Sequence, residues 1–228
     1  MSVEVVSYRL AYRGKPAGTQ VIKTEVLGRV RRMEAKAVFQ GPLGNVTVTQ
    51  RSRSSAQHHH SIRFLEETQE RSAKRVFDVQ FDPQTGLVRA TTGPKDVATT
   101  PYIRPYRDPL SLLGQVRDLA GTSAYGVAML GKDVSVQFAG EVELGTALGE
   151  RRAWAYVLHP GGSVVYVDVR EPHTILKLTQ RLADGQLDSL LVSVASEASL
   201  EGFGEDEAGG TRGQKRRGRR RPRRRKRG

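Results

Sequence analysis

The last seventeen residues carry the side chains best suited to binding a charged partner. Twelve of the chain's 37 Lys and Arg residues lie between residues 212 and 228, and none of its 24 Asp and Glu residues does. A guanidinium group binds phosphate through two parallel hydrogen bonds and also stacks on bases, so an Arg-rich segment favours nucleic acid as its partner. The candidate nucleic-acid-binding residues of this segment are Arg212, Lys215, Arg216, Arg217, Arg219, Arg220, Arg221, Arg223, Arg224, Arg225, Lys226 and Arg227.

This basic tail is predicted to be disordered, because it has no aromatic or aliphatic side chain from residue 212 onward. No element that could read bases accompanies it, so the expected binding to DNA or RNA is independent of sequence. Twelve contacts to duplex DNA would give log affinity a slope of about −11 against log salt. Two alternatives remain open: attraction to an anionic membrane surface, and a solubilising tail with no partner.

A second set of candidate nucleic-acid-binding residues is predicted on a strand. Arg51 and Arg53 fall on one face with Thr47 and Thr49, and further arginines occupy positions 29, 31 and 32. A basic stripe across a sheet is one way to follow a nucleic-acid backbone. The alternative is an ordinary solvated strand face, since residues 1–211 hold 25 basic side chains against 24 acidic ones.

The sequence gives little indication of a metal site or a catalytic site. His58 and His60 would share a face of a strand, but no third ligand stands at a diagnostic spacing, so no metal site is predicted. The absence of cysteine excludes disulfides, thiolate metal sites and cysteine nucleophiles. Sequence motifs for a serine nucleophile, a phosphate-binding loop, a zinc protease or a dinucleotide site are missing too. A non-enzymatic protein without a cofactor is therefore expected.

The surrounding elements are predicted to be strands, because apolar residues alternate with polar ones through most of the chain. Gly- and Pro-rich turns separate these runs. About eleven antiparallel strands are expected, in a half-barrel or open barrel that is mainly β. The clearest alternating runs are residues 6–12, 32–40, 76–82, 134–138 and 154–158.

One segment has helical spacing instead. Asp108 is a suitable N-cap and Pro109 a favourable first helical residue. The apolar residues after them fall on one face of a short helix, at Leu110, Leu112, Leu113, Val116 and Leu119. We expect this single inserted helix to cover one face of the sheet.

Three short motifs carry a family resemblance that spans about residues 3–197. They are residues 8–12 with Gly14 and Gly18, residues 107–113 with Val116 and Arg117, and residues 140–146. In these the chain resembles a bacterial family of unknown function, usually exported, whose fold is similar to the half-barrel of lipoprotein-carrier proteins. The resemblance implies an incomplete barrel around a helix, with a concave face for an acyl chain or another apolar ligand. The basic tail and the lack of a visible signal peptide depart from that family.

Three regions are predicted: a β domain over residues 1–198, an acidic Gly-rich linker over 199–211, and the basic tail over 212–228. The linker's acids are Glu201, Glu205, Asp206 and Glu207, and one hypothesis is that they fold back on the tail. Residues 1–9 do not resemble a signal peptide, and no apolar stretch reaches the roughly 20 residues needed to cross a bilayer. A cytoplasmic location is expected.

The leading functional interpretation is a non-enzymatic protein that attaches to nucleic acid through its basic tail. A carrier of lipid or another apolar ligand is the first alternative. A structural module that assembles through exposed strand edges is the second, and the oligomeric state is left open.

Overall fold

Fourteen antiparallel strands form one open sheet in the computed structural model, which describes residues 3–93 and 96–197. The strands are β1 (Val3–Tyr12), β2 (Lys15–Leu27), β3 (Val30–Phe39), β4 (Val46–Ser55), β5 (Ser61–Glu70), β6 (Ala73–Asp82), β7 (Leu87–Gly93), β8 (Asp96–Pro101), β9 (Ala124–Met129), β10 (Lys132–Thr146), β11 (Gly149–His159), β12 (Ser163–Asp168), β13 (Ile175–Leu182) and β14 (Gly185–Glu197). The helix α1 (Pro109–Arg117) and a 3-10 turn (Gly41–Leu43) complete the described elements. The expectation of a mainly β fold with an inserted helix is confirmed.

The predicted strand number, about eleven, is wrong, because some strands lack the alternating pattern. All six residues of β8 are exposed, since it forms one edge of the sheet and the described residues cover neither of its faces. A strand that buries nothing places no constraint on which of its residues are apolar. Its sequence, Asp-Val-Ala-Thr-Thr-Pro, therefore reads as a connection rather than as a strand.

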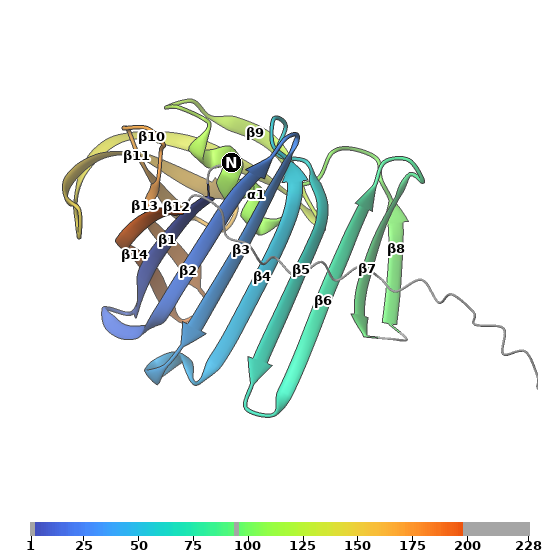
Figure 1. Ribbon diagram of the computed structural model, residues 1–228, viewed down its shortest axis with the longest axis horizontal. Helices are drawn as coiled ribbons and strands as arrows, with labels where there is room; N and C mark the ends of the chain where they lie inside the picture. The colour runs from blue at the N-terminus through green and yellow to red at the C-terminus, as the bar shows by residue number, and fades with distance from the viewer. Residues whose placement is uncertain (1–2, 94–95, 198–228) are drawn as a thin grey trace, which may run out of the picture.

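The order of the strands explains how the sheet is organised. From β1 to β8 and from β9 to β14 each strand pairs with its neighbour in sequence, and the two halves join where β1 pairs with β14. The two edge strands, β8 and β9, are consecutive along the chain. The connection between them carries α1 behind the broad wall of β1–β8, as Figure 1 shows. The helix therefore lies inside the curve of the sheet, where it was expected.

Asp108 fixes the start of the helix and ties it to the sheet. Its Oδ1 atom accepts bonds from the backbone N–H groups of Leu110 and Ser111, both 2.9 Å long. Its Oδ2 atom accepts bonds from the hydroxyls of Ser52 on β4 (2.7 Å) and Ser61 on β5 (2.6 Å). Burial raises the pKa of Asp108, and the hydrogen bonds to it oppose that shift. The predicted N-cap is thus confirmed, with two sheet contacts that the sequence did not reveal.

The helix contributes to two hydrophobic clusters, a larger one that draws on both halves of the sheet and a second one on β9–β13. Leu110 packs with residues of β1–β7 such as Tyr8 and Phe64. Leu112 and Val116 pack instead with residues of β9–β13. Because these helical residues bury apolar surface against strands of both halves, α1 holds the two halves together around a common core. In the described ranges, no helix has the length and apolar character that a membrane span requires.

Candidate functional site

The basic tail lies outside the described residues, so the structure places only two of the predicted nucleic-acid-binding residues. Arg51 and Arg53 share one face of β4, as predicted, and both are exposed, whereas Ser52 and Ser54 on the other face are buried towards α1. Arg51 forms ion pairs with Glu34 on β3 (2.8 Å) and Glu67 on β5 (3.6 Å), which neutralise its charge. Arg53 makes no hydrogen bond or ion pair with any described residue.

Arg53 belongs to a row of arginines that runs across neighbouring strands. It lies directly opposite Arg32 on β3 and Arg63 on β5. The same register continues through Gln80 on β6 to Arg89 on β7. We call Arg32, Arg53, Arg63 and Arg89 the arginine row. Since neighbouring strands are about 4.8 Å apart, the row extends over about 19 Å.

The arginine row carries excess positive charge. Arg63 forms two hydrogen bonds with Asp78, of 3.0 and 2.8 Å. Arg32, Arg53 and Arg89 have no such partner among the described residues, although Glu25 lies opposite Arg32. Like charges directly opposite each other destabilise a sheet. An arrangement that costs stability and gives three guanidinium groups no partner within residues 3–93 and 96–197 is suited to binding an anion from solution.

A shallow hollow of about 540 Å³ adjoins the middle of the arginine row. Arg53 and Arg63 line it together with Gln80 and His60, so it offers several hydrogen-bond donors. Asp82 is a nearby acid, but hydrogen bonds from Thr85 and Gln84 in the turn after β6 hold its pKa below the usual range. The acid is thus already engaged by its own turn.

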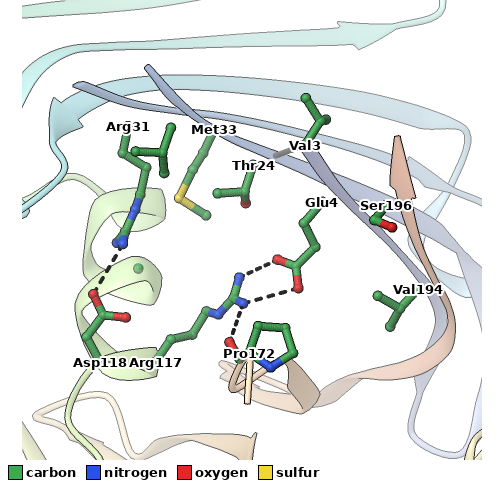
Figure 2. Close-up of a pocket in the computed structure, with 12 residues that line it drawn as sticks. Val3, Glu4, Thr24, Arg31, Met33, Arg117, Asp118, Pro172, Val194 and Ser196 are labelled. Carbon is green, nitrogen blue, oxygen red and sulfur yellow. Dashed lines mark hydrogen bonds and ion pairs between the residues drawn. The ribbon is translucent and has the colours of Figure 1, made fainter. Parts of the chain in front are cut away.

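A second cavity, of about 330 Å³, lies between α1 and the inner face of β1–β3 and β14. Figure 2 shows its apolar side chains, including Met33, Val194 and Pro172, beside an ion pair between Arg117 and Glu4. We call this cavity the inner pocket. Its lining combines an apolar wall with charged groups that already have partners.

Arg117, at the end of α1, uses its donors on two different parts of the chain. Its Nη1 and Nη2 atoms lie 2.5 and 3.1 Å from the two carboxylate oxygens of Glu4. Its remaining bonds go to the backbone carbonyls of His173 (2.9 Å) and Pro172 (2.8 Å). Thr174 donates a further bond to Glu4. The pair closes the inner pocket at one end and leaves no free charge there.

At the other side of the inner pocket, Arg31 lies on the inner face of β3, separate from the arginine row. It contacts Asp118 (3.2 Å) and His59 (2.9 Å), and His59 also contacts Asp118 (3.2 Å). Burial alone would raise the pKa of Asp118, but the bond from His59 and the charge of Arg31 outweigh it, so the pKa is lowered. A Cβ atom at Gly114 would come within 2.7 Å of Arg31, so this helical glycine makes room for the cluster.

The three consecutive histidines lie in and after the turn that follows β4, not within a strand. The rings of His58 and His60 stack with their centres 5.5 Å apart. Burial is the main factor that lowers the pKa of His60. Among the described residues, no three His, Cys, Asp or Glu side chains gather in a way that could hold a metal ion.

An open antiparallel sheet curved around one helix defines a class of barrel-like proteins. The chain belongs to the family described as protein of unknown function DUF3108, whose family model matches residues 7–192. The resemblance inferred from the sequence is therefore confirmed. Among curated proteins there is no match.

A solved structure of similar fold is the beta-barrel-like protein of domain of unknown function DUF1849 from Brucella abortus. It has a TM-score of 0.58 and 10% sequence identity, over 86% of this chain and 98% of that chain. At this identity the likeness shows the fold alone.

Proposed function

We propose that this protein is a non-enzymatic nucleic-acid-binding protein that holds DNA or RNA with its basic tail and its arginine row. The observation that supports this most is the row itself, in which Arg32, Arg53 and Arg89 have no ion-pair partner among the described residues. The nearby hollow adds neutral donors that can bond to phosphate oxygens. The tail supplies the larger charge, and the row supplies a fixed surface on which a backbone can lie.

The dimensions of the arginine row suit a nucleic-acid backbone. Phosphates follow one another at about 3.4 Å of rise along each strand of a duplex, so about 19 Å corresponds to five or six phosphates. The row contacts phosphates and reads no bases, and such contacts position a protein without specifying sequence. Binding is therefore expected to be insensitive to sequence and strongly dependent on salt.

Fluorescence anisotropy with a labelled oligonucleotide of about 20 nucleotides tests this function, at salt concentrations from about 50 to 200 mM. Each phosphate contact to duplex DNA contributes about −0.9 to the slope of log affinity against log salt. The triple variant Arg32→Gln, Arg53→Gln, Arg89→Gln should therefore reduce the magnitude of the slope by up to about 2.7. Deletion of residues 212–228 should reduce it further.

Arg104→Gln is the matched control, because it also removes an exposed guanidinium but one that is paired with Asp133 away from the row. This variant should change the slope by less than about half of the contribution that one phosphate contact makes. An unchanged slope in the triple variant would remove the row from the interface. Absence of binding by the full chain at low salt would overturn the function itself.

The inner pocket supports a second candidate function, the binding of an apolar ligand. Val26 and Val194 line the pocket yet remain 38% exposed each, so apolar surface is accessible there. Titration with a fluorescent long-chain fatty acid tests this candidate. Thr24→Phe, which fills the pocket from β2, should abolish the signal, whereas Val97→Phe on the exposed strand β8 should preserve it. Equal binding by both variants would exclude the inner pocket.

A further inference from the structure

The arginine row lies in the same register as the last described residue of β14. Glu197 is opposite Val3 on β1, Val3 is opposite Glu25 on β2, and Glu25 is opposite Arg32. The chain therefore leaves the sheet at the level of the row, three strands away from its first arginine. The residues that follow include the four acids Glu201, Glu205, Asp206 and Glu207.

The spacing of these acids matches the distances along the row. Three strand intervals place Arg32 about 14 Å from Glu197, and seven place Arg89 about 34 Å away. An extended chain advances about 3.4 Å per residue, so four residues reach about 14 Å and ten reach about 34 Å. Glu201 can thus reach the first arginine of the row, and Glu207 can reach the last.

From this match we propose that the acidic segment 201–207 docks along the arginine row of its own chain. The charges are complementary: four carboxylates meet three guanidinium groups that lack partners among the described residues. Docking would also relieve the repulsion between Arg32 and Arg53, which face each other directly. Glu25 is the one acid of this register on β1–β7. It lies on β2, one strand nearer to β14 than Arg32 is, so Glu201 passes beyond Glu25 when it reaches Arg32.

Docking of this kind restrains nucleic-acid binding. This consequence rests on the function proposed above, whereas the docking itself does not. Nucleic acid and the acidic segment compete for the same guanidinium groups, so the segment lowers affinity until an oligonucleotide displaces it. Surface ion pairs are individually weak and are screened by salt. The restraint is therefore expected at low salt and should fade as salt rises. The basic tail beyond residue 211 stays available to capture nucleic acid first.

A spin label tests the docking without nucleic acid. The chain has no cysteine, so Phe203→Cys gives a single attachment point. Six residues beyond Glu197 span about 20 Å, close to the four strand intervals that lead to Arg53. In amide NMR spectra of the full chain, the label should broaden the signals of β3–β5 around Arg53. Broadening should fall when Arg32, Arg53 and Arg89 are all changed to Gln. Equal broadening in that variant would overturn the docking.

Deletion of residues 212–228 separates this model from one in which the acids bind the basic tail. Docking on the row predicts that broadening around Arg53 persists after the deletion, and its loss would contradict the proposal. The variant Glu201→Gln, Glu205→Gln, Asp206→Asn, Glu207→Gln should bind an oligonucleotide about tenfold more tightly at low salt. That gain should disappear when the row is also neutralised, and a gain that remains would contradict the proposal.

The two proposals can fail separately. Broadening around Arg53 without any oligonucleotide binding would refute the nucleic-acid function and leave the docking intact. Binding that depends on the arginine row without any broadening would refute the docking and leave the function intact.

Discussion

The network around Asp108 gives the sharpest test of how this fold is held together. Asp108 is only 3% exposed, and its carboxylate receives four hydrogen bonds, two from the helix backbone and two from serines of β4 and β5. Asp108→Ala removes all four acceptors at once. Asp108→Asn keeps an oxygen for the helix backbone but replaces the atom that accepts from the two serines with an amide donor. The two variants therefore separate capping from attachment to the sheet.

The expected cost of Asp108→Ala follows from these parts. Loss of an N-cap costs about 1 kcal/mol. Ser52 and Ser61 are 2% and 3% exposed, so water does not replace their lost acceptor. Each unsatisfied buried hydroxyl costs about 1–3 kcal/mol. The free energy of unfolding should thus fall by about 3–7 kcal/mol in Asp108→Ala, and by about 2–6 kcal/mol in Asp108→Asn, in which the N-cap is kept.

Urea unfolding followed by circular dichroism measures both changes. With a slope of about 2 kcal/mol per molar urea, a loss of 4 kcal/mol moves the midpoint down by about 2 M. The double variant Ser52→Ala, Ser61→Ala provides a comparison that leaves the N-cap in place. A loss below about 1 kcal/mol in Asp108→Ala would refute the reasoning, as would equal losses in the Ala and Asn variants.

Three other changes have defined outcomes. Asp118→Asn should lower the free energy of unfolding by about 1 kcal/mol at pH 7; because the pKa of Asp118 is lowered by folding, this difference should vanish in urea titrations as the pH falls below the usual value of 3.8. Gly18→Ala should cost at least about 3 kcal/mol, because a Cβ atom at φ +133° would lie 2.0 Å from the carbonyl oxygen of Val38. Thermal melts measure this loss, and the control Gly161→Ala, with open space around it, should leave the melting temperature nearly unchanged. Val97→Lys on the exposed edge strand β8 should leave stability within about 0.5 kcal/mol; loss of a dimer in light scattering would show that copies assemble through this edge.

Local patterns predicted most of the fold because its elements obey local rules. The helix start at Asp108 and Pro109 was correct, since capping chemistry depends on residues within one turn. Runs such as residues 76–82 were correct because one face of the strand is buried. The edge strand β8 has no buried face, so its sequence carries no alternation from which a strand could be predicted. The contacts of Asp108 with β4 and β5 could not be predicted, because they join residues about 50 positions apart.

The candidate site was predictable only in part. The sequence singled out Arg51 and Arg53 together because they share a face of one strand. In the structure the two arginines have different surroundings. Arg51 forms ion pairs with Glu34 and Glu67 on the neighbouring strands, whereas Arg53 lies opposite two arginines. Strand register decides between those outcomes, and register is set by the whole sheet rather than by one strand. Arg89 lies in none of the alternating runs that the sequence made clear, so its place beside the other arginines could not be predicted.

The pairing of β1 with β14 has a consequence for synthesis on the ribosome. About 185 residues separate the end of β1 from the end of β14, so the first strand emerges long before its second partner exists. At roughly 5–20 residues per second, one edge of β1 stays open for roughly 10–40 seconds. Open edges invite pairing with other chains. Nascent copies on neighbouring ribosomes are therefore at greatest risk of mispairing through β1, until the last strand of the sheet closes that edge.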